Sequence, residues 1–405
     1  MADNAWPTLP LEELIRNFDS RRVPIKGSDR KPGPFPYYGA SGIVDRVNDY
    51  LFDGEYLLIA EDGENLRTRQ TPIAFMATGK FWVNNHAHVV QGNDRASTRY
   101  LSYALAATDV SGYLSGSTMP KLTQGNLNRI PVIAPPLTEQ KRIAHILGTL
   151  DDKIELNRRM NATLEAIARA LFQSWFVDFE PVRRNAEGGE PQSEDSLFPE
   201  LFEDSKIGDV PKGWEVGSIL READLLSGGT PKTDVSDYWN GSIPWASAKD
   251  VSQCGEAFLV STERTITKLG VDKSATKIIP ALSTVVVARG ATTGRLTMFG
   301  DSMAMNQTCY ALRSKLDAPF ALYCHARHFI ERLVQGAHGS VFETITTSTF
   351  EATDVLLAPK EVLLAFDQKV APMLEQIRAN ILQSRTLSAL RDTLLPKLLS
   401  GNIRI

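Results

Sequence analysis

The sequence predicts an α+β protein in which two similar, mainly β domains are separated by two long helices. Three observations predict this fold class: the length of 405 residues, an internal repeat, and a heptad pattern at the end of each repeat copy. A chain of this length normally forms more than one domain. In the chain order domain, helix, domain, helix, the second helix can pair with the first only by running back along it. We therefore expect an antiparallel coiled coil with pseudo-two-fold symmetry.

The repeat has a constant offset over some sixty residues. Gly116-Ser117 recurs as Gly339-Ser340, and the further matches at an offset of 223 include Thr123 and Thr346, Val132 and Val355, Ile154 and Ile377, Asn157 and Asn380, and Leu164 and Leu387. Upstream the offset slips by one, so that Asn84 matches Asn306 and His88 matches Tyr310. Single matches arise by chance, but a constant offset that ends in the same kind of helix indicates two copies of one module.

The first part of each copy is predicted to be mainly β. Residues 56–60 and 284–288 are short runs of apolar and β-branched residues that lead into turns containing glycine. Such runs are typical of strands. A helix-rich interpretation of these domains is the alternative.

The second part of each copy has the heptad period of a coiled-coil helix. The seam positions are Leu150, Ile154, Asn157, Leu164 and Leu171 in the first copy and Met373, Ile377, Asn380, Leu387 and Leu394 in the second. Gly148-Thr149 and Ala371-Pro372 predict a break in each segment, followed by a helix of about 27 residues, or roughly 40 Å. The alternative is that each apolar stripe packs on its own domain. Asn157 and Asn380 at equivalent seam positions favour pairing of the helices, because polar seam residues set register.

These patterns predict the domain boundaries. We expect a first β-rich domain over 1–135, a helical spacer over 136–176, a linker over 177–213, a second β-rich domain over 214–359 and a C-terminal helical spacer over 360–405. The linker is predicted because 185–193 is rich in Gly, Glu and polar residues, a composition typical of solvated segments.

Composition and charge exclude several classes of protein. The net charge of −4 excludes a grossly basic protein that coats nucleic acid by charge alone. Three scattered cysteines, Cys254, Cys309 and Cys324, do not form a disulfide framework and indicate a reducing compartment. The N-terminus has no signal-peptide pattern, and no apolar stretch is long enough to span a membrane. We expect a cytoplasmic protein with no membrane contact.

The motifs of catalysis are missing from the sequence. Gly79-Lys80 is followed by Phe81, so the chain has no nucleotide-binding phosphate loop. The only Pro-Pro, at 135–136, lacks the Asp or Asn of a DNA amino-methyltransferase motif. Asp204-Ser205-Lys206 stands in the linker, which argues against a nuclease site. His86, His88, Cys324, His325 and His328 do not form a metal-ligand set at usual spacing. The sequence predicts binding and not catalysis, with no metal and no cofactor in this chain.

Several segments resemble the DNA-specificity subunit of Type I restriction-modification systems, and they cover nearly the whole chain. In the first half they are 36–43 (PYYGASGI), 52–58 (FDGEYLL) and 84–89 (NNHAHV), and in the centre 135–143 (PPLTEQKRI), 150–154 (LDDKI) and 171–176 (LFQSWF). In the second half they are 228–232 (GGTPK), 238–245 (YWNGSIPW) and 288–294 (ARGATTG). The doubled layout is also that of this family.

The resemblance implies a function. Each mainly β domain would be a target recognition domain that reads one half of a split double-stranded DNA target. The helices would hold the halves apart and dock two modification subunits, which bind S-adenosylmethionine and methylate adenine. Restriction subunits with motor and nuclease activity would join them. Two alternatives are a paired-domain scaffold that binds proteins without reading DNA, and a self-sufficient DNA methyltransferase, which no sequence feature supports.

Candidate DNA contacts are polar residues near predicted turns. In the first domain they are Arg67, Arg69, Lys80, Asn84, Asn85, His86 and Lys121; in the second they are Lys232, Lys249, Arg289, Thr292, Thr293, Arg295, Asn306, Gln307 and Thr346. Arg can bridge guanine, and Asn or Gln can bridge adenine, in the major groove. The alternative for each residue is a solvated or turn-capping role. For Asn84 and Asn306 the matched position indicates a shared structural role.

Overall fold

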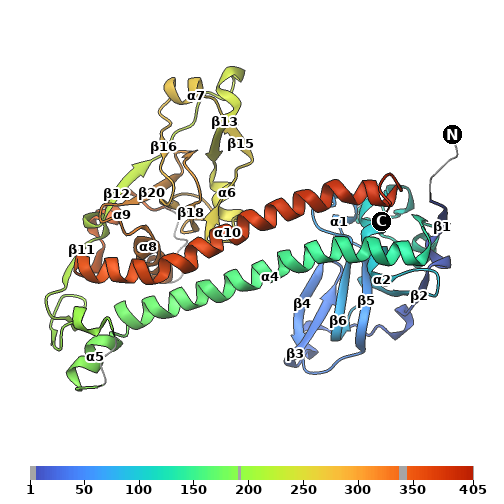
Figure 1. The fold of residues 1–405 in the computed structure, drawn as a ribbon, viewed down its shortest axis with the longest axis horizontal. Helices are drawn as coiled ribbons and strands as arrows, with labels where there is room; N and C mark the ends of the chain where they lie inside the picture. Colours follow the sequence, from blue (N-terminus) through green and yellow to red (C-terminus); the bar gives the residue numbers. More distant parts are fainter. Residues whose placement is uncertain (1–5, 190–192, 337–343, 405) are drawn as a thin grey trace. The chain divides into compact units, whose positions relative to one another are not determined.

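The structure of this chain is a computed structural model, which describes residues 6–189, 193–336 and 344–404. The chain divides into two compact units, each described separately: unit 1 comprises Met1–Ile154 and Thr386–Ile405, and unit 2 comprises Glu155–Arg385. Each unit contains one mainly β domain and part of both long helices (Figure 1). The predicted α+β class with two repeated domains is confirmed.

Two helices of equal length end the two repeat copies. Helix α4 spans Leu137–Phe176 and α10 spans Lys360–Leu399, 40 residues each, so both ends of α10 lie 223 residues after those of α4. The predicted break in each helix is wrong. The helix continues through Gly148, since Ile143, Ala144 and Leu147 before it are buried. The Arg99 side chain fills the space beside Gly148, and a Cβ there would lie 2.7 Å from the guanidinium carbon. Pro372 is exposed between the buried residues Val370 and Leu374, whose packing holds the helix where one hydrogen bond is lost.

The two helices pair antiparallel within each unit. In unit 2, Asn157 Nδ2 donates to Ser384 Oγ at 3.1 Å, and Asn380 Nδ2 donates to Asn161 Oδ1 at 2.9 Å. These two contacts are images of each other under the repeat, because Asn157 matches Asn380 and Asn161 matches Ser384 at the offset of 223. In unit 1, Asp151 Oδ1 accepts from Arg391 Nη1 at 2.8 Å. Along these contacts the residue number rises in α4 as it falls in α10, so the helices are antiparallel. None of the ten seam residues named above is exposed.

Unit 1 holds one curled six-stranded sheet. Its strand order is β2 (Ile15–Asn17), β7 (Ala87–Gly92), β5 (Phe52–Ala60), β6 (Ala74–Val83), β3 (Pro32–Gly39) and β4 (Gly42–Val47). The short strands β1 (Thr8–Pro10) and β8 (Pro131–Ile133) pair separately, and the helices are α1 (Asn65–Thr68), α2 (Thr98–Ala107) and α3 (Gln124–Asn128).

Unit 2 divides the same plan between two sheets. The first has the order β12 (Ala223–Ser227), β20 (Cys309–Ser314), β17 (Thr284–Val287), β18 (Leu296–Phe299) and β14 (Phe258–Leu259); the second has β15 (Arg264–Ile266), β13 (Trp239–Ala246), β19 (Met303–Met305) and β16 (Ile278–Ile279). Strands β11 (Glu215–Ser218) and β21 (Asp354–Leu357) pair separately. The helices are α6 (Ala248–Gln253), α7 (Lys268–Asp272), α8 (Pro319–Gly336) and α9 (Thr347–Ala352).

The strand pairings identify which strands of the two domains correspond. Strands β2, β7 and β5 follow the same order as β12, β20 and β17. The parallel pair of Tyr38 with Val83 corresponds to the parallel pair of Ala246 with Met305. The long strand β6 therefore corresponds to β18 and β19 together, which residues 300–302 separate.

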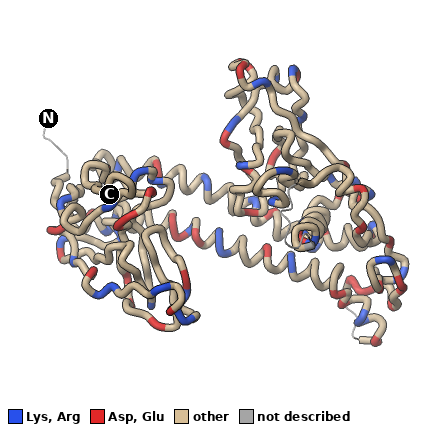
Figure 2. Tube along the Cα trace, turned by 180° about the vertical axis from the view of Figure 1, so that it is seen from behind, with Lys and Arg blue, Asp and Glu red and all other residues tan. Residues whose placement is uncertain are grey.

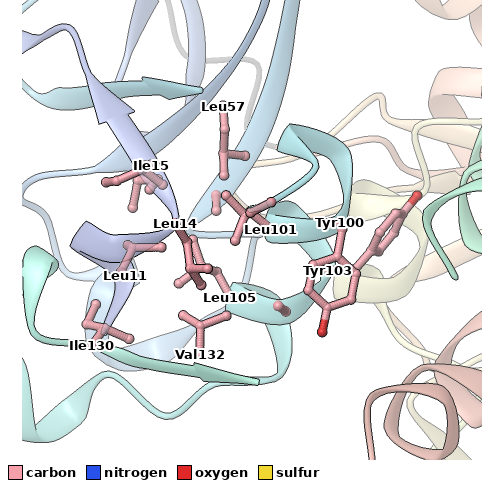
Figure 3. Close-up of a cluster of buried hydrophobic side chains, with 14 of the residues drawn as sticks. Leu11, Leu14, Ile15, Leu57, Tyr100, Leu101, Tyr103, Leu105, Ile130 and Val132 are labelled. Atoms are coloured by element: carbon pink, nitrogen blue, oxygen red, sulfur yellow. The ribbon is translucent and has the colours of Figure 1, made fainter. Parts of the chain in front are cut away.

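The core of unit 1 lies between the sheet and α2 (Figure 3). Ser97 caps helix α2. The apolar face of α2 contributes the buried residues Tyr100, Leu101 and Leu105 to one cluster with Leu57 of β5. The Tyr103 hydroxyl reaches α4, donating to Asp151 Oδ2 at 2.6 Å. This packing fixes the domain on the start of α4.

The segment between α4 and the second domain, described over 177–189 and 193–213, contains more regular structure than its composition indicates. It contains helix α5 (Glu180–Ala186) and strands β9 (Phe202–Glu203) and β10 (Val210–Pro211). Val182 and Phe198 are buried in the core that holds Trp175. These apolar residues, and not the polar stretch between them, decide its packing.

Among the described residues, no helix is long and apolar enough to cross a membrane.

Candidate nucleic-acid interface

In unit 1, three distant segments meet just beyond the end of β5. The Glu61 amide donates to the His86 carbonyl at 2.9 Å, and the Leu122 amide donates to the Glu61 carbonyl at 2.7 Å. Asn84 Oδ1 accepts from the His86 amide at 2.8 Å, which closes a turn between β6 and β7. Asp62 then lies in an antiparallel bridge with Lys121.

Unit 2 repeats these contacts beyond the end of β17. The Ala288 amide donates to the Thr308 carbonyl at 2.8 Å, and the Ile345 amide donates to the Ala288 carbonyl at 2.8 Å. Asn306 Oδ1 accepts from the Thr308 amide at 3.2 Å. Arg289 lies in an antiparallel bridge with Thr344.

We call this shared set of contacts the loop frame. Its positions are Glu61, Asp62, Asn84, His86, Lys121 and Leu122 in unit 1, and Ala288, Arg289, Asn306, Thr308, Thr344 and Ile345 in unit 2. The side-chain oxygens of Asn84 and Asn306 each accept a hydrogen bond that closes the turn. This contact is the structural role that the two residues share. The other side chains of the frame differ between the units.

The frame of unit 1 carries four ionisable side chains, which lie in two pairs. His86 Nδ1 lies 2.8 Å from Asp62 Oδ2, and Lys121 Nζ lies 3.2 Å from Glu61 Oε1. Arg67, in the last turn of α1, donates to the Gly116 carbonyl at 3.1 Å, and its side chain is 42% exposed. The frame thus brings His86 and Lys121 to either side of Asp62, and Asn85 is exposed next to His86. Arg67 contacts the loop that leads to Lys121.

A buried ionic network supports the frame from behind. His88 Nδ1 lies 2.6 Å from Asp19 Oδ2, and His88 Nε2 donates to the Leu122 carbonyl at 2.8 Å. Arg22 donates to Glu61 Oε2 at 2.7 Å. Burial raises the pKa of Asp19, but the bonds from His88 and the Val89 amide, with the charge of Arg22, outweigh burial and hold this pKa below its ordinary value.

We expect Asp19→Asn to lower the free energy of unfolding by about 1–3 kcal/mol at pH 7, because His88 then loses a charged partner. The folded pKa of Asp19 lies below its unfolded value. Its contribution is therefore present above about pH 4 and is lost as the pH falls through the folded pKa. Urea unfolding of both proteins at pH 7 and at pH 3 measures this. Asp94→Asn is the control, since Asp94 is 95% exposed in its ion pair with Arg16; an equal effect of the two substitutions would contradict the prediction.

In unit 2 a glycine-rich loop after β12 lies against the frame. The Gly229 amide donates to the Met305 carbonyl at 2.9 Å, and a Cβ on Gly228 would lie 2.1 Å from the Asn306 carbonyl oxygen. Two tryptophans hold the loop: Trp245 Nε1 donates to the Gly229 carbonyl and Trp239 Nε1 to the Lys232 carbonyl, both at 3.0 Å. The Thr230 hydroxyl bonds to Gln307 Oε1, so the exposed Lys232 and Gln307 lie beside the frame.

The turn from β17 to β18 carries the remaining candidates of unit 2. Thr293 Oγ1 donates to the Gly290 carbonyl at 2.7 Å, and the Gly294 amide returns to Val287. Gly290 and Gly294 have φ of 100° and 87°, a conformation that favours glycine. Thr292, Arg289 and Arg295 are exposed. Within the described part of the chain, the side chains of Arg289 and Arg295 have no hydrogen-bond or ion-pair partner.

Four candidates have structural partners of their own. Arg69 donates to the Leu105 and Ala106 carbonyls at the end of α2, at 3.0 and 3.2 Å. Lys80 lies on β6 opposite Asp53, 4.6 Å from the Tyr50 ring. Lys249 Nζ pairs with Glu263 at 2.7 Å, and Thr346 caps α9. None of these contacts belongs to the loop frame.

Several residues of this region are not among the predicted DNA contacts, including Asp62 in the frame and Thr230 beside it. The loop after β5 covers 61–73, whereas the turn after β17 covers 288–295. This difference in length hides the correspondence of Asp62 with Arg289 from any comparison at constant offset. Only the shared bridge to Lys121 and Thr344, which do match at 223, reveals it.

The described residues contain no group of three His, Cys, Asp or Glu side chains that could hold a metal ion. His88 and His325 are instead buried against Asp19 and Glu222. Along the described trace of each unit, Lys and Arg are interspersed with Asp and Glu (Figure 2). Any nucleic-acid contact therefore depends on individually placed groups and not on a uniform positive field.

Comparisons with known proteins agree with the repeat. A family model described as "Type I restriction modification DNA specificity domain" matches residues 4–166 and 211–390. The Type I restriction enzyme HindI specificity subunit of Haemophilus influenzae is 26% identical over 411 residues, covering 87% of this chain and 84% of that protein. The MjaIX specificity subunit of Methanocaldococcus jannaschii is 27% identical over 362 residues, covering 86% and 79%. The crystal structure of the S subunit of a Type I restriction-modification system from M. genitalium shares the fold, with a TM-score of 0.66 at 12% identity over 98% of this chain and 97% of that one.

Proposed function

Because this chain belongs to the Type I restriction-modification DNA specificity family, we propose that it reads a bipartite DNA target, with one half read by each β-rich domain. It is a DNA-specificity subunit. The observation that supports the two-part reading is the loop frame, which occurs once in each domain with the same backbone contacts and different side chains. Two readers with one frame and different exposed groups are suited to two different short sequences.

The partners follow from this function. Double-stranded DNA is the ligand, and the helix pair α4 and α10 offers two repeat-related surfaces to two modification subunits. Those subunits bind S-adenosylmethionine and methylate adenine, and restriction subunits join the same assembly. This chain contributes recognition and no bond-making group, since its sequence carries no methyltransferase or nuclease motif.

The assembled modification complex tests the proposal. We expect the complex to methylate adenines in a two-part target with a fixed gap, read by sequencing of methylated bases in randomised duplexes. The purified chain alone should transfer no methyl group from S-adenosylmethionine. Retention of DNA by the modification subunits equally well with and without this chain would favour a protein-binding scaffold instead. Methyl transfer by the chain alone would favour a self-sufficient methyltransferase.

A further inference from the structure

The loop frame places side chains of opposite charge at one equivalent position of the two domains. Asp62 follows Glu61, and Arg289 follows Ala288; the amides of Glu61 and Ala288 bond to the turns that Asn84 and Asn306 close. Asp62 bridges to Lys121 and Arg289 to Thr344, which match at the offset of 223. The Asp62 side chain is 21% exposed and the Arg289 residue is exposed. The backbone contacts on either side of the two residues are the same. Asp62 and Arg289 therefore occupy the same position of the frame with side chains of opposite charge.

The charge of Asp62 decides what this position faces in a DNA complex. A carboxylate beside a phosphate is repelled, whereas the edge of a base offers amino groups that a carboxylate accepts from. Lys121 lies opposite Asp62 in the bridge, and Arg67 contacts the loop that leads to Lys121, so the cations near this position are available for phosphates. His86, at 2.8 Å, orients the carboxylate and leaves lone pairs for another donor.

Resting on the function proposed above, we propose that Asp62 and Arg289 are the equivalent base-reading residues of the two domains. Arg289 forms two hydrogen bonds to a guanine in the half-site of the second domain. Asp62 accepts from the exocyclic amino group of cytosine or adenine in the half-site of the first domain. The free guanidinium of Arg289 suits the two acceptors of guanine, because no described residue engages its donors.

The test compares variants of this chain in complex with the modification subunits on randomised duplexes. Arg289→Ala should lose its preference at one G·C pair of one half-site, by roughly 5- to 150-fold, with the other half-site unchanged. Arg289→Lys keeps the charge without the planar fork and should lose the same preference while methylating DNA at a higher overall rate than Arg289→Ala. Asp62→Ala should relax one position of the other half-site.

Arg295→Ala is the matched control, because it removes an equally exposed arginine from the same turn. We expect it to weaken methylation of all sequences evenly. If Arg289→Ala also lowered methylation evenly and left the target unchanged, Arg289 would be a phosphate contact and the proposal would be overturned. An unaltered target and rate would place it outside the interface. Failure of the unmodified complex to show a two-part target would overturn the proposed function itself, a result distinct from both. Matching thermal unfolding curves confirm that the variants fold.

Discussion

Ile377→Asp is expected to disrupt the helix pair of unit 2 and to lower the free energy of unfolding by about 3–5 kcal/mol. Ile377 is 0% exposed and belongs to the core that also holds Ala168 and Phe172 of α4. A carboxylate there loses its hydration without gaining a partner, and the isoleucine leaves a void. Guanidinium unfolding followed by circular dichroism measures the loss.

The repeat supplies the control for this experiment. Ile154 is the equivalent of Ile377, but it is only partly buried. Ile154→Asp should therefore cost less than Ile377→Asp, since its charge stays partly hydrated. Ile377→Val keeps the site apolar and should cost about 1 kcal/mol. Equal stability of Ile377→Asp and the unmodified protein would show that the helices do not depend on this seam.

Exchange of residues 1–135 with the same segment of another family member is expected to change one whole half of the DNA target. The other half and the gap should stay as they were, because the second domain and both long helices are retained. Methylated-base sequencing of the hybrid complex reports all three features at once.

The reciprocal exchange of residues 214–359 should change the other half. The first exchange must preserve packing within unit 1, where Leu398 and Leu399 of α10 share a core with Leu11, Leu101 and Val132 of the exchanged segment. A hybrid that folds and alters the half-site of the second domain would contradict the assignment of one half-site to each domain.

Much of the fold was predictable because the sequence contains an internal repeat. The matches at offset 223 predicted two copies, and the heptads predicted two helices whose observed ends obey the same offset. The polar seam residues Asn157 and Asn380 predicted helix pairing, and each bonds to a residue of the other helix. Patterns of this kind are local and periodic, so a single sequence displays them.

The candidate site was less predictable, because residue type does not reveal which partners a side chain already has. Arg69 and Arg289 look alike in sequence, yet Arg69 is engaged by the carbonyls that end α2, whereas Arg289 faces solvent. Thr346 is a polar residue near a predicted turn, and its hydroxyl accepts from the Thr349 amide as a helix cap.

The sequence by itself determined that this protein is a duplicated module with two paired helices and that it resembles a DNA-specificity subunit. Only the tertiary structure decided that α4 continues past Gly148, and that Asp62 and Arg289 occupy one position. The reason is physical. Helix periods and repeats are patterns of residues near one another in the chain, so the sequence displays them. Contacts between segments far apart in the chain leave no such pattern. Arg99 fills the space beside Gly148, and the bond between Leu122 and Glu61 anchors the loops.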